Sequence, residues 1–194
     1  MYIAANIDDC ALVINDFLPP DLFKKISEYD YSLLDTIDSY KDWEKKLFAD
    51  SQGNITLNSV KTTNGTIANA KGNKIESKND LFKNFFKILM DCPFIPYQVN
   101  SQLKLSYYEY DKFSGINWHD DRGYTLNYSF YIHNEWDVDW GGETLIDTGR
   151  GLPLSTIPVP NSMLVVKSKI RHKVCAIVGP EKRRVLQVRG NYYK

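Results

Sequence analysis

The chain has 194 residues, of which 43% are hydrophobic and 25% charged. This length suits one globular domain, and this composition excludes wholesale disorder and collagen-like repetition. Basic and acidic residues balance at 24 each, so net charge draws the chain neither to nucleic acid nor to anionic membranes.

Cysteine content and the N-terminal segment bear on the compartment. Cys10, Cys92 and Cys175 form no CxxC or other zinc spacing, and three cysteines are too few for a disulfide scaffold. The N-terminal segment contains Asp8 and Asp9 and lacks the basic region of a secretory signal peptide. No apolar run approaches the ~20 residues that span a bilayer. We therefore expect a cytoplasmic protein without nucleic-acid or membrane partners.

One strand and three helices are predicted in the first half of the chain. Residues 10–17 (CALVINDF) are typical of a strand. A helix should begin with the Pro19-Pro20-Asp21 segment, because proline suits a first helical turn and an aspartate there complements the helix dipole. A second helix is predicted over Asp42–Phe48. A third is predicted over Asn79–Asp91, where many apolar residues indicate burial against a sheet.

A polar segment, residues 51–77, separates the second and third predicted helices. It is rich in Gly, Asn, Ser, Thr and Lys, and the Asn64-Gly65 pair within it predicts a loose hairpin rather than an interdomain linker. Long polar segments in compact domains are commonly functional or disordered. We hypothesise that residues 51–77 form a mobile lid over an active-site mouth; the alternative is a surface excursion remote from the site.

From Gln102 onward the pattern changes to short strands. Alternating, β-branched or aromatic runs are separated by turn signals such as Ser114-Gly115, Gly141-Gly142 and Gly179-Pro180. The runs are QLKLSYYEY, YTLNYSFYIH, GGETLID, SMLVVKS, HKVCAIV and RRVLQVR. Six or more such strands predict a β-sandwich or jelly-roll. The expected architecture is therefore α+β and mainly β, with a helical N-terminal layer packed on an all-β C-terminal core.

Two of the three histidines stand in a pattern that suits a metal ion. His119 and Asp121 are two residues apart, so in an extended chain both side chains leave the same face. His172 begins a later predicted strand. Two imidazoles and one carboxylate form the facial triad of non-haem Fe(II) oxygenases. A His-x-Asp pair alone is a weak signal, because neighbouring His and Asp residues on a surface are commonly solvated.

Five elements in order make the C-terminal half resemble the 2-oxoglutarate- and Fe(II)-dependent oxygenases, specifically the prolyl 4-hydroxylase-like branch. They are a tyrosine-bearing strand before His-x-Asp (YYEYDKFSGINWHDD), the strand end FYIHN, the Gly-Gly-Glu-Thr turn, the stretch PVPNSMLVV, and a His-x-Val followed by basic residues. The resemblance covers roughly residues 102–190. The first 100 or so residues fit the family's helical support layer only loosely.

The resemblance implies a fold and a metal site. The fold is a double-stranded β-helix, the cupin-like jelly-roll, in a single oxygenase domain over residues 1–194. Residues 1–100 would supply helical support and the lid, and residues 101–194 the jelly-roll core. The resemblance also implies that His119, Asp121 and His172 bind Fe(II).

The same resemblance implies a site for 2-oxoglutarate. A basic residue should pair with its distal carboxylate, for which a guanidinium is well suited. Aligning Val185 with the family motif selects Arg183, with Lys182 and Arg184 as neighbouring alternatives. Further expected cosubstrate contacts are Tyr131, Tyr110 and Asn127. His133 departs from the family pattern and is interpreted as a non-ligand.

The implied activity is hydroxylation of an unactivated C–H bond, using Fe(II), 2-oxoglutarate and dioxygen, with ascorbate as a candidate reductant. The carboxylate of Asp121 disfavours halogenation, because the halogenating relatives lack it. A prolyl residue, another amino acid and a small metabolite are all open as substrates. The alternative from a different class is a non-catalytic cupin-like module that binds a metal or ligand.

Overall fold

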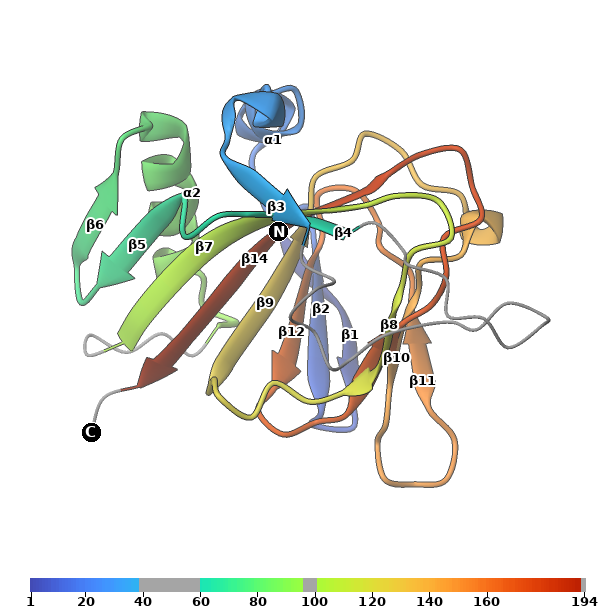
Figure 1. The fold of residues 1–194 in the computed structure, drawn as a ribbon. Helices are drawn as coiled ribbons and strands as arrows, with labels where there is room; N and C mark the ends of the chain where they lie inside the picture. Colours follow the sequence, from blue (N-terminus) through green and yellow to red (C-terminus); the bar gives the residue numbers. More distant parts are fainter. Residues whose placement is uncertain (39–59, 96–100, 193–194) are drawn as a thin grey trace.

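The structure is a computed structural model that describes residues 1–38, 60–95 and 101–192. Within these residues the chain forms two antiparallel β-sheets, two α-helices and short 3₁₀ turns such as η1 (Tyr31–Leu33) and η3 (Val138–Trp140) (Figure 1). Strands distant in sequence lie side by side, as in a jelly-roll. The mainly β fold class expected from the sequence is confirmed.

The larger sheet holds strands from both halves of the chain. Its order is β1 (Tyr2–Ile7), β2 (Ala11–Asn15), β12 (Met163–Lys167), β9 (Leu126–Tyr131), β14 (Arg183–Tyr192), β7 (Ser101–Tyr110), β4 (Val60–Thr63) and β3 (Thr36–Asp38). β5 (Ala68–Lys71) also pairs with β7, and β6 (Lys74–Ser77) pairs with β5. The N-terminal part of the chain therefore extends this sheet as well as covering it.

The smaller sheet carries the histidines of interest. Its order is β11 (Leu154–Thr156), β10 (Thr144–Ile146), β13 (His172–Val174) and β8 (Ile116–His119). Each strand is only three or four residues long, so the sheet is narrow along its strands. It contributes Ile146 and Val174 to an apolar cluster that also contains Tyr131 and Val185 of the larger sheet. The two sheets therefore share one interior.

Helices cover the other face of the larger sheet. The α1 helix (Pro20–Ser27) has proline in its first turn, and α2 (Asp80–Asp91) begins at Asn79, whose side chain accepts a hydrogen bond from the Leu81 amide (2.9 Å). The fully buried Phe85 of α2 packs its ring 5.4 Å from that of Phe130 on β9. Burial of such aromatic side chains is the main stabilising term. Neither helix is long and apolar enough to cross a lipid bilayer.

Alternation along β7 and β14 divides the molecule into two interiors. Leu105 and Val188 face the helices and belong to the larger apolar cluster. Tyr110 and Val185 face the smaller sheet. The polar side chains of β14 that share the second face, Arg183 among them, therefore point between the two sheets.

The sequence predictions for helices and strands are confirmed in most of the described chain. The helix after Pro19, the helix over residues 79–91 and the six C-terminal strands are present. The helix predicted over Asp42–Phe48 lies outside the described residues. The strands β1, β3, β8 and β11 were not predicted. β1 lacks strong alternation of apolar residues, and the other three have only three or four residues each.

The lid hypothesis is wrong for residues 60–77. Both β4 and β5 pair with β7, so this part of the segment is built into the larger sheet. The tight hairpin joins β5 to β6 and turns at Gly72, whereas Asn64-Gly65 connects β4 to β5. Small apolar residues such as Ala68 and Ala70 are buried there, which the polar composition concealed. Residues 51–59 lie outside the described part of the chain.

Candidate metal centre

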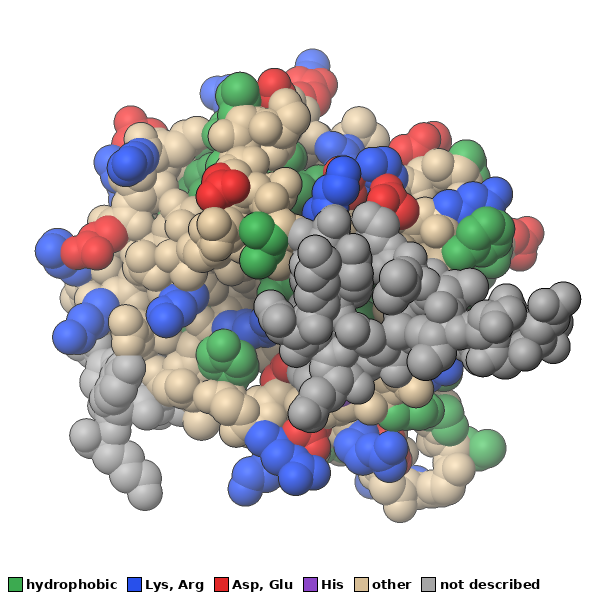
Figure 2. Space-filling view, in the orientation of Figure 1, with side chains coloured by type: hydrophobic (Ala, Val, Ile, Leu, Met, Phe, Trp, Pro, Cys, Tyr) green, Lys and Arg blue, Asp and Glu red, His purple; other side chains and the backbone are tan. Residues whose placement is uncertain are grey.

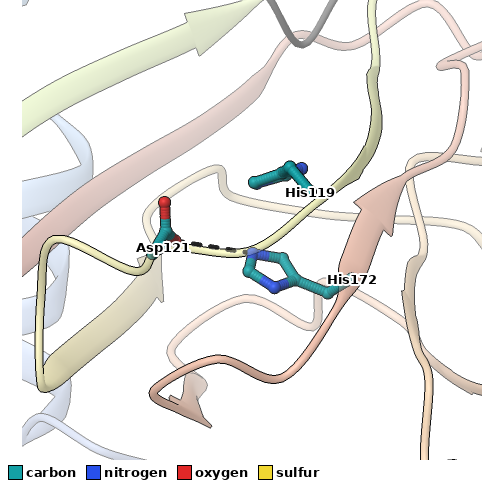
Figure 3. A group of neighbouring side chains, drawn as sticks. All are labelled: His119, Asp121 and His172. Carbon is teal, nitrogen blue, oxygen red and sulfur yellow. Dashed lines mark ion pairs between the residues drawn. The ribbon is translucent and has the colours of Figure 1, made fainter.

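Two histidines of the smaller sheet lie close to Asp121 (Figure 3). His119 ends β8 and His172 begins β13, and the register places them directly opposite each other, with ring centroids 4.3 Å apart. Asp121 follows β8, and its Oδ2 lies 3.6 Å from His172 Nε2. Ligand atoms of the three residues all lie within 4.8 Å of one another. The structure therefore brings together the three residues singled out in the sequence.

Hydrogen bonds to the backbone set the orientation of both imidazoles. His119 Nδ1 lies 2.7 Å from the carbonyl oxygen of Asn117, and His172 Nδ1 lies 3.0 Å from that of Ile170. A carbonyl only accepts, so each Nδ1 carries the proton and the lone pair of each neutral ring resides on Nε2. This arrangement is common for metal-binding histidines.

A chain of amides holds the Asp121 carboxylate. Asn127 Nδ2 donates to Asp121 Oδ2, and Gln187 Nε2 donates to Asn127 Oδ1. Ser129 Oγ in turn donates to Gln187 Oε1 (2.9 Å). Contacts of this kind fix ligand geometry in metal sites. Asn127 was expected to contact cosubstrate, whereas here its amide engages Asp121 and Gln187.

The spacing of the triad suits one octahedral ion. Atoms about 2.1 Å from one ion and at right angles to each other lie about 3 Å apart. The 3.6 Å separation between Asp121 and His172 needs a closure of less than 1 Å to meet that geometry, and a pair at the 4.8 Å limit of the group needs about 2 Å. Two nitrogens and one carboxylate oxygen are the donor set of non-haem Fe(II) sites with open positions. The residues present therefore fit such an ion.

Arg183 reaches into the same pocket from β14. It is only 2% exposed, and its Nη2 donates to the Tyr131 hydroxyl (3.3 Å) and to Thr144 Oγ1 (3.2 Å). Its Cζ lies 5.0 Å from the ring centroid of Tyr110 and 4.9 Å from that of Tyr131. Its Nε is buried without a hydrogen-bond partner among the described residues. A buried guanidinium with these neighbours is suited to receive a carboxylate.

The two neighbouring basic side chains point elsewhere. Lys182 Nζ is at the surface and pairs with Glu109 (2.7 Å) and Asp111 (3.0 Å). Arg184 is on the helix-facing side of β14 and donates to the Ser27 carbonyl oxygen (3.2 Å). Alternation along the strand thus selects Arg183 as the basic residue of the three that faces the pocket.

The pocket combines polar groups with an apolar wall. Besides the triad, its lining includes Tyr110, Asn127, Ser129, Thr144, Arg183, Gln187 and Arg189, and the apolar residues Ile116, Leu164, Val166 and Val174. Burial raises the pKa of Tyr110 to about 12, although the Arg183 charge acts in the opposite direction. The phenol is therefore neutral near pH 7. Tyr131 reaches the pocket through its hydrogen bond to Arg183.

Sequence reasoning missed four polar residues of this pocket, Thr144 of β10 among them. Gln187, Ser129 and Arg189 were not predicted, although Gln187 and Arg189 share strand parity with Arg183 and Ser129 shares it with Asn127. That parity was the available signal.

Other polar and aromatic residues of the C-terminal half have partners of their own. His133 is buried and lies outside the grouped residues, and its Nε2 donates to the Pro158 carbonyl oxygen (2.6 Å). Arg122 pairs with Asp120 at the surface (2.7 Å). Trp140 packs against Trp136, with ring centroids 5.8 Å apart.

Comparisons with known proteins give a consistent picture at the level of the fold. No family model matches the sequence, and no curated protein matches it. An oxidoreductase of the 2OG-Fe(II) oxygenase family from Burkholderia pseudomallei superposes with a TM-score of 0.65 at 14% identity, over 94% of this chain and 85% of that one. A prolyl-4-hydroxylase from Pseudomonas putida superposes with a TM-score of 0.64 at 12% identity, over 95% of this chain and 93% of that one.

A third solved structure extends the likeness to a peptide complex. It is a prolyl hydroxylase from Trichoplax adhaerens bound to a peptide fragment of the oxygen degradation domain of hypoxia inducible factor, with a TM-score of 0.63 at 14% identity, over 93% of this chain and 82% of that one. At such identities the likeness is one of fold. The chain thus has the fold of the 2-oxoglutarate- and Fe(II)-dependent oxygenases, prolyl hydroxylases among them, as the sequence resemblance implied.

Proposed function

We propose that the protein is an Fe(II)- and 2-oxoglutarate-dependent dioxygenase that hydroxylates an unactivated C–H bond. The observation that carries the proposal is the His119–Asp121–His172 group, with both imidazoles oriented by backbone carbonyls, in one pocket with the buried Arg183. In this proposal residues 1–194 act as one oxygenase domain. Bound Fe(II), with 2-oxoglutarate and dioxygen, would supply the oxidation that protein side chains cannot perform.

The chain's own residues bind, orient and shield. His119 and His172 would ligate the metal through Nε2 and Asp121 through one carboxylate oxygen. Arg183 would hold the distal carboxylate of 2-oxoglutarate. The Tyr131 hydroxyl accepts from Arg183 and so keeps its own proton to donate to that carboxylate.

The apolar wall has a separate task. Ile116, Leu164, Val166 and Val174 line the pocket and would exclude water from the reacting centre. The free volume among the lining side chains is about 30 Å³, room for about two water molecules. Binding of a dicarboxylate therefore requires long side chains such as Arg183 to rearrange.

The substrate class is open in this proposal. A prolyl residue, another amino acid and a small metabolite all suit hydroxylation at such a site. The peptide in the Trichoplax prolyl hydroxylase complex makes a peptidyl prolyl residue one candidate. Ascorbate is a candidate reductant for keeping the iron in the Fe(II) state.

Metal binding and succinate formation test the proposal. Wild-type protein with Fe(II) and 2-oxoglutarate is expected to develop a metal-to-ligand charge-transfer absorption band without dioxygen, and to form succinate once dioxygen is admitted. The variants His119→Ala, Asp121→Ala and His172→Ala should lose both signals. Asp120→Ala is the matched control, because that neighbouring carboxylate pairs with Arg122.

Two outcomes would contradict the proposal in different ways. Absence of the absorption band in wild-type protein would remove the metal site. A normal band without succinate, across prolyl peptides and free amino acids, would instead favour the non-catalytic cupin-like module.

A further inference from the structure

A second guanidinium lines the pocket and has no role in the chemistry above. Arg189 lies farther along β14 than Arg183, with the same strand parity, so both side chains point between the sheets. Arg189 Nη1 donates to the Tyr108 hydroxyl (2.9 Å). Its Cζ lies 5.4 Å from the ring centroid of Tyr108 and 5.6 Å from that of Tyr124. Two tyrosines therefore hold the guanidinium at the pocket.

Arg189 has a buried donor without an acceptor. Its Nε has no hydrogen-bond partner among the described residues. Burial lowers the pKa of this guanidinium, but the nearby Tyr108 phenol and Asp121 carboxylate raise it. Asp121 lines the same pocket, but its carboxylate accepts from Asn127 and faces His172. A buried donor without an acceptor is costly, which indicates that Arg189 is arranged for an anion.

The strand next to Arg189 adds a second positive charge. The register of β14 and β7 places Lys104 directly opposite Arg189. Opposite residues of an antiparallel pair share a face, and like charges there repel each other. An anion bound between the two side chains would convert this repulsion into attraction.

Lys104 also borders a surface groove of about 700 Å³ formed by β5, β6 and β7. Lys71 and Lys74 line this groove, and its acidic residue, Glu76, pairs with Lys74 (2.7 Å). Figure 2 shows basic side chains spread over this region of the sheet. Such a field would steer an anionic ligand toward Arg189.

We propose that Arg189, with Lys104 beside it, binds a carboxylate of the primary substrate. The inference rests on the proposed function and narrows its substrate class to small carboxylic acids such as free amino acids. Arg189 and Asp121 line one pocket, so a carboxylate bound at Arg189 would keep the rest of a small acid in the pocket of the metal group. An internal prolyl residue of a peptide has no charged group of its own.

Arg183 and Arg189 take different anions in this arrangement. A strand rises about 3.3 Å per residue, so the Cα atoms of the two arginines are separated by about 20 Å along β14. Arg183 lies with Tyr131 and Thr144 at one end of the pocket, and Arg189 lies with Tyr108 and Tyr124 at the other. One end thus serves the cosubstrate and the other the substrate.

Binding to the Mn(II)-loaded protein with 2-oxoglutarate tests the inference, because this complex binds substrate without turnover. The probes are free L-proline and a set of other free L-amino acids, each paired with its primary amide, and a prolyl peptide blocked at both ends. Isothermal titration calorimetry should show binding of at least one free acid, binding of its amide weaker by at least tenfold, and no binding of the blocked peptide.

Charge variants assign the effect to Arg189. Arg189→Gln should weaken binding of the acid by about 10- to 100-fold and change the affinity for 2-oxoglutarate by less than about threefold. Arg189→Lys keeps the charge but loses the planar guanidinium, so its affinity for the acid should lie between those of the wild type and Arg189→Gln. Lys104→Gln should have a smaller, salt-dependent effect. Arg184→Gln is the matched control, because it removes the same charge from the opposite face of β14.

Several results would overturn the inference. The inference would be wrong if acid and amide bound equally, or if no acid bound. It would also be wrong if the blocked peptide bound in preference to the acids. A loss of 2-oxoglutarate affinity in Arg189→Gln as large as that in Arg183→Gln would instead assign Arg189 to the cosubstrate. Failure of the proposed function is distinguishable, since wild-type protein would then not bind Mn(II) and 2-oxoglutarate before any probe is added. Retained 2-oxoglutarate binding also shows that a variant is folded.

Discussion

Replacing Arg183 by methionine should change stability and cosubstrate binding in opposite directions. In the structure this guanidinium is 2% exposed, donates to two neutral hydroxyl groups, and forms no ion pair with a carboxylate of the described residues. Burying a charge without a counter-charge is unfavourable, and replacing buried charges by apolar side chains of similar size is often neutral or stabilising. Without 2-oxoglutarate, Arg183→Met should therefore be as stable as the wild type, or more stable by up to about 3 kcal/mol.

The same substitution removes the partner expected for the distal carboxylate. Loss of one partner of a buried charge pair costs about 2–5 kcal/mol, and the lower figure corresponds to a ~30-fold rise in Kd. A ligand at 100 times its Kd stabilises the folded state by about 2.7 kcal/mol, and a 30-fold weaker Kd leaves about 0.9 kcal/mol of that gain.

Urea unfolding with and without 2-oxoglutarate, on Mn(II)-loaded protein, measures both quantities. Arg184→Met is the control, because Arg184 donates to the Ser27 carbonyl oxygen on the opposite face of the strand. The reasoning would be refuted if Arg183→Met kept the full stabilisation by 2-oxoglutarate, or if Arg184→Met lost it. A large destabilisation of ligand-free Arg183→Met would show that the Tyr131 and Thr144 hydrogen bonds outweigh the cost of burying the charge.

Three further predictions concern the scaffold. Phe85→Ala should lower the free energy of unfolding by about 3–5 kcal/mol in urea titrations, because this fully buried ring packs against neighbouring aromatic rings. Gly142→Ala should cost about 1–3 kcal/mol and weaken 2-oxoglutarate binding in calorimetry, because Gly142 has φ +71° and an added Cβ would lie 2.9 Å from Trp136 Cζ2 and 3.4 Å from Arg183 Cδ. Burial lowers the pKa of His133 to about 4, so the unfolded chain takes up the proton first. The free energy of unfolding should therefore fall by at most ~3 kcal/mol as the pH drops from about 6.5 to 4. In His133→Gln the urea midpoint should change less over the same pH range.

Most of the fold could be predicted because its signals are local. The helix over Asp80–Asp91 shows a capping asparagine and an apolar face within its own residues, and β9 and β14 show runs of β-branched and aromatic side chains. The segment 60–77 was misread because its burial depends on pairing with β7. Small residues such as Ala68 and Ala70 give little apolar signal on their own, although both are fully buried in the sheet.

The three grouped ligand residues could be predicted for a different reason. His119 and Asp121 are adjacent on one face of the chain, so their proximity is set by local geometry alone. His172 needed the family resemblance, because its distance from His119 depends on the pairing of β13 with β8. The choice among Lys182, Arg183 and Arg184 depended on the face of β14 that each occupies, and only the alignment of the strand with its neighbours decides that.

Strand parity was the one local signal for the polar residues behind the triad, and it does not reveal their roles, because each role is defined by a partner. Asn127 was singled out for cosubstrate, yet its amide lies between Asp121 and Gln187, and Gln187 is 60 residues away from Asn127 in the sequence. Arg189 looked like one of several basic residues near the C-terminus, and its position opposite Lys104 appears only in the register of β14 and β7. A basic residue in a strand is ordinarily solvated. Arg189 instead lines a pocket opposite Lys104, and its buried Nε has no acceptor among the described residues, an arrangement suited to an anionic ligand. The proposed substrate class therefore depends most on Arg189, a residue that the sequence alone offered little reason to single out.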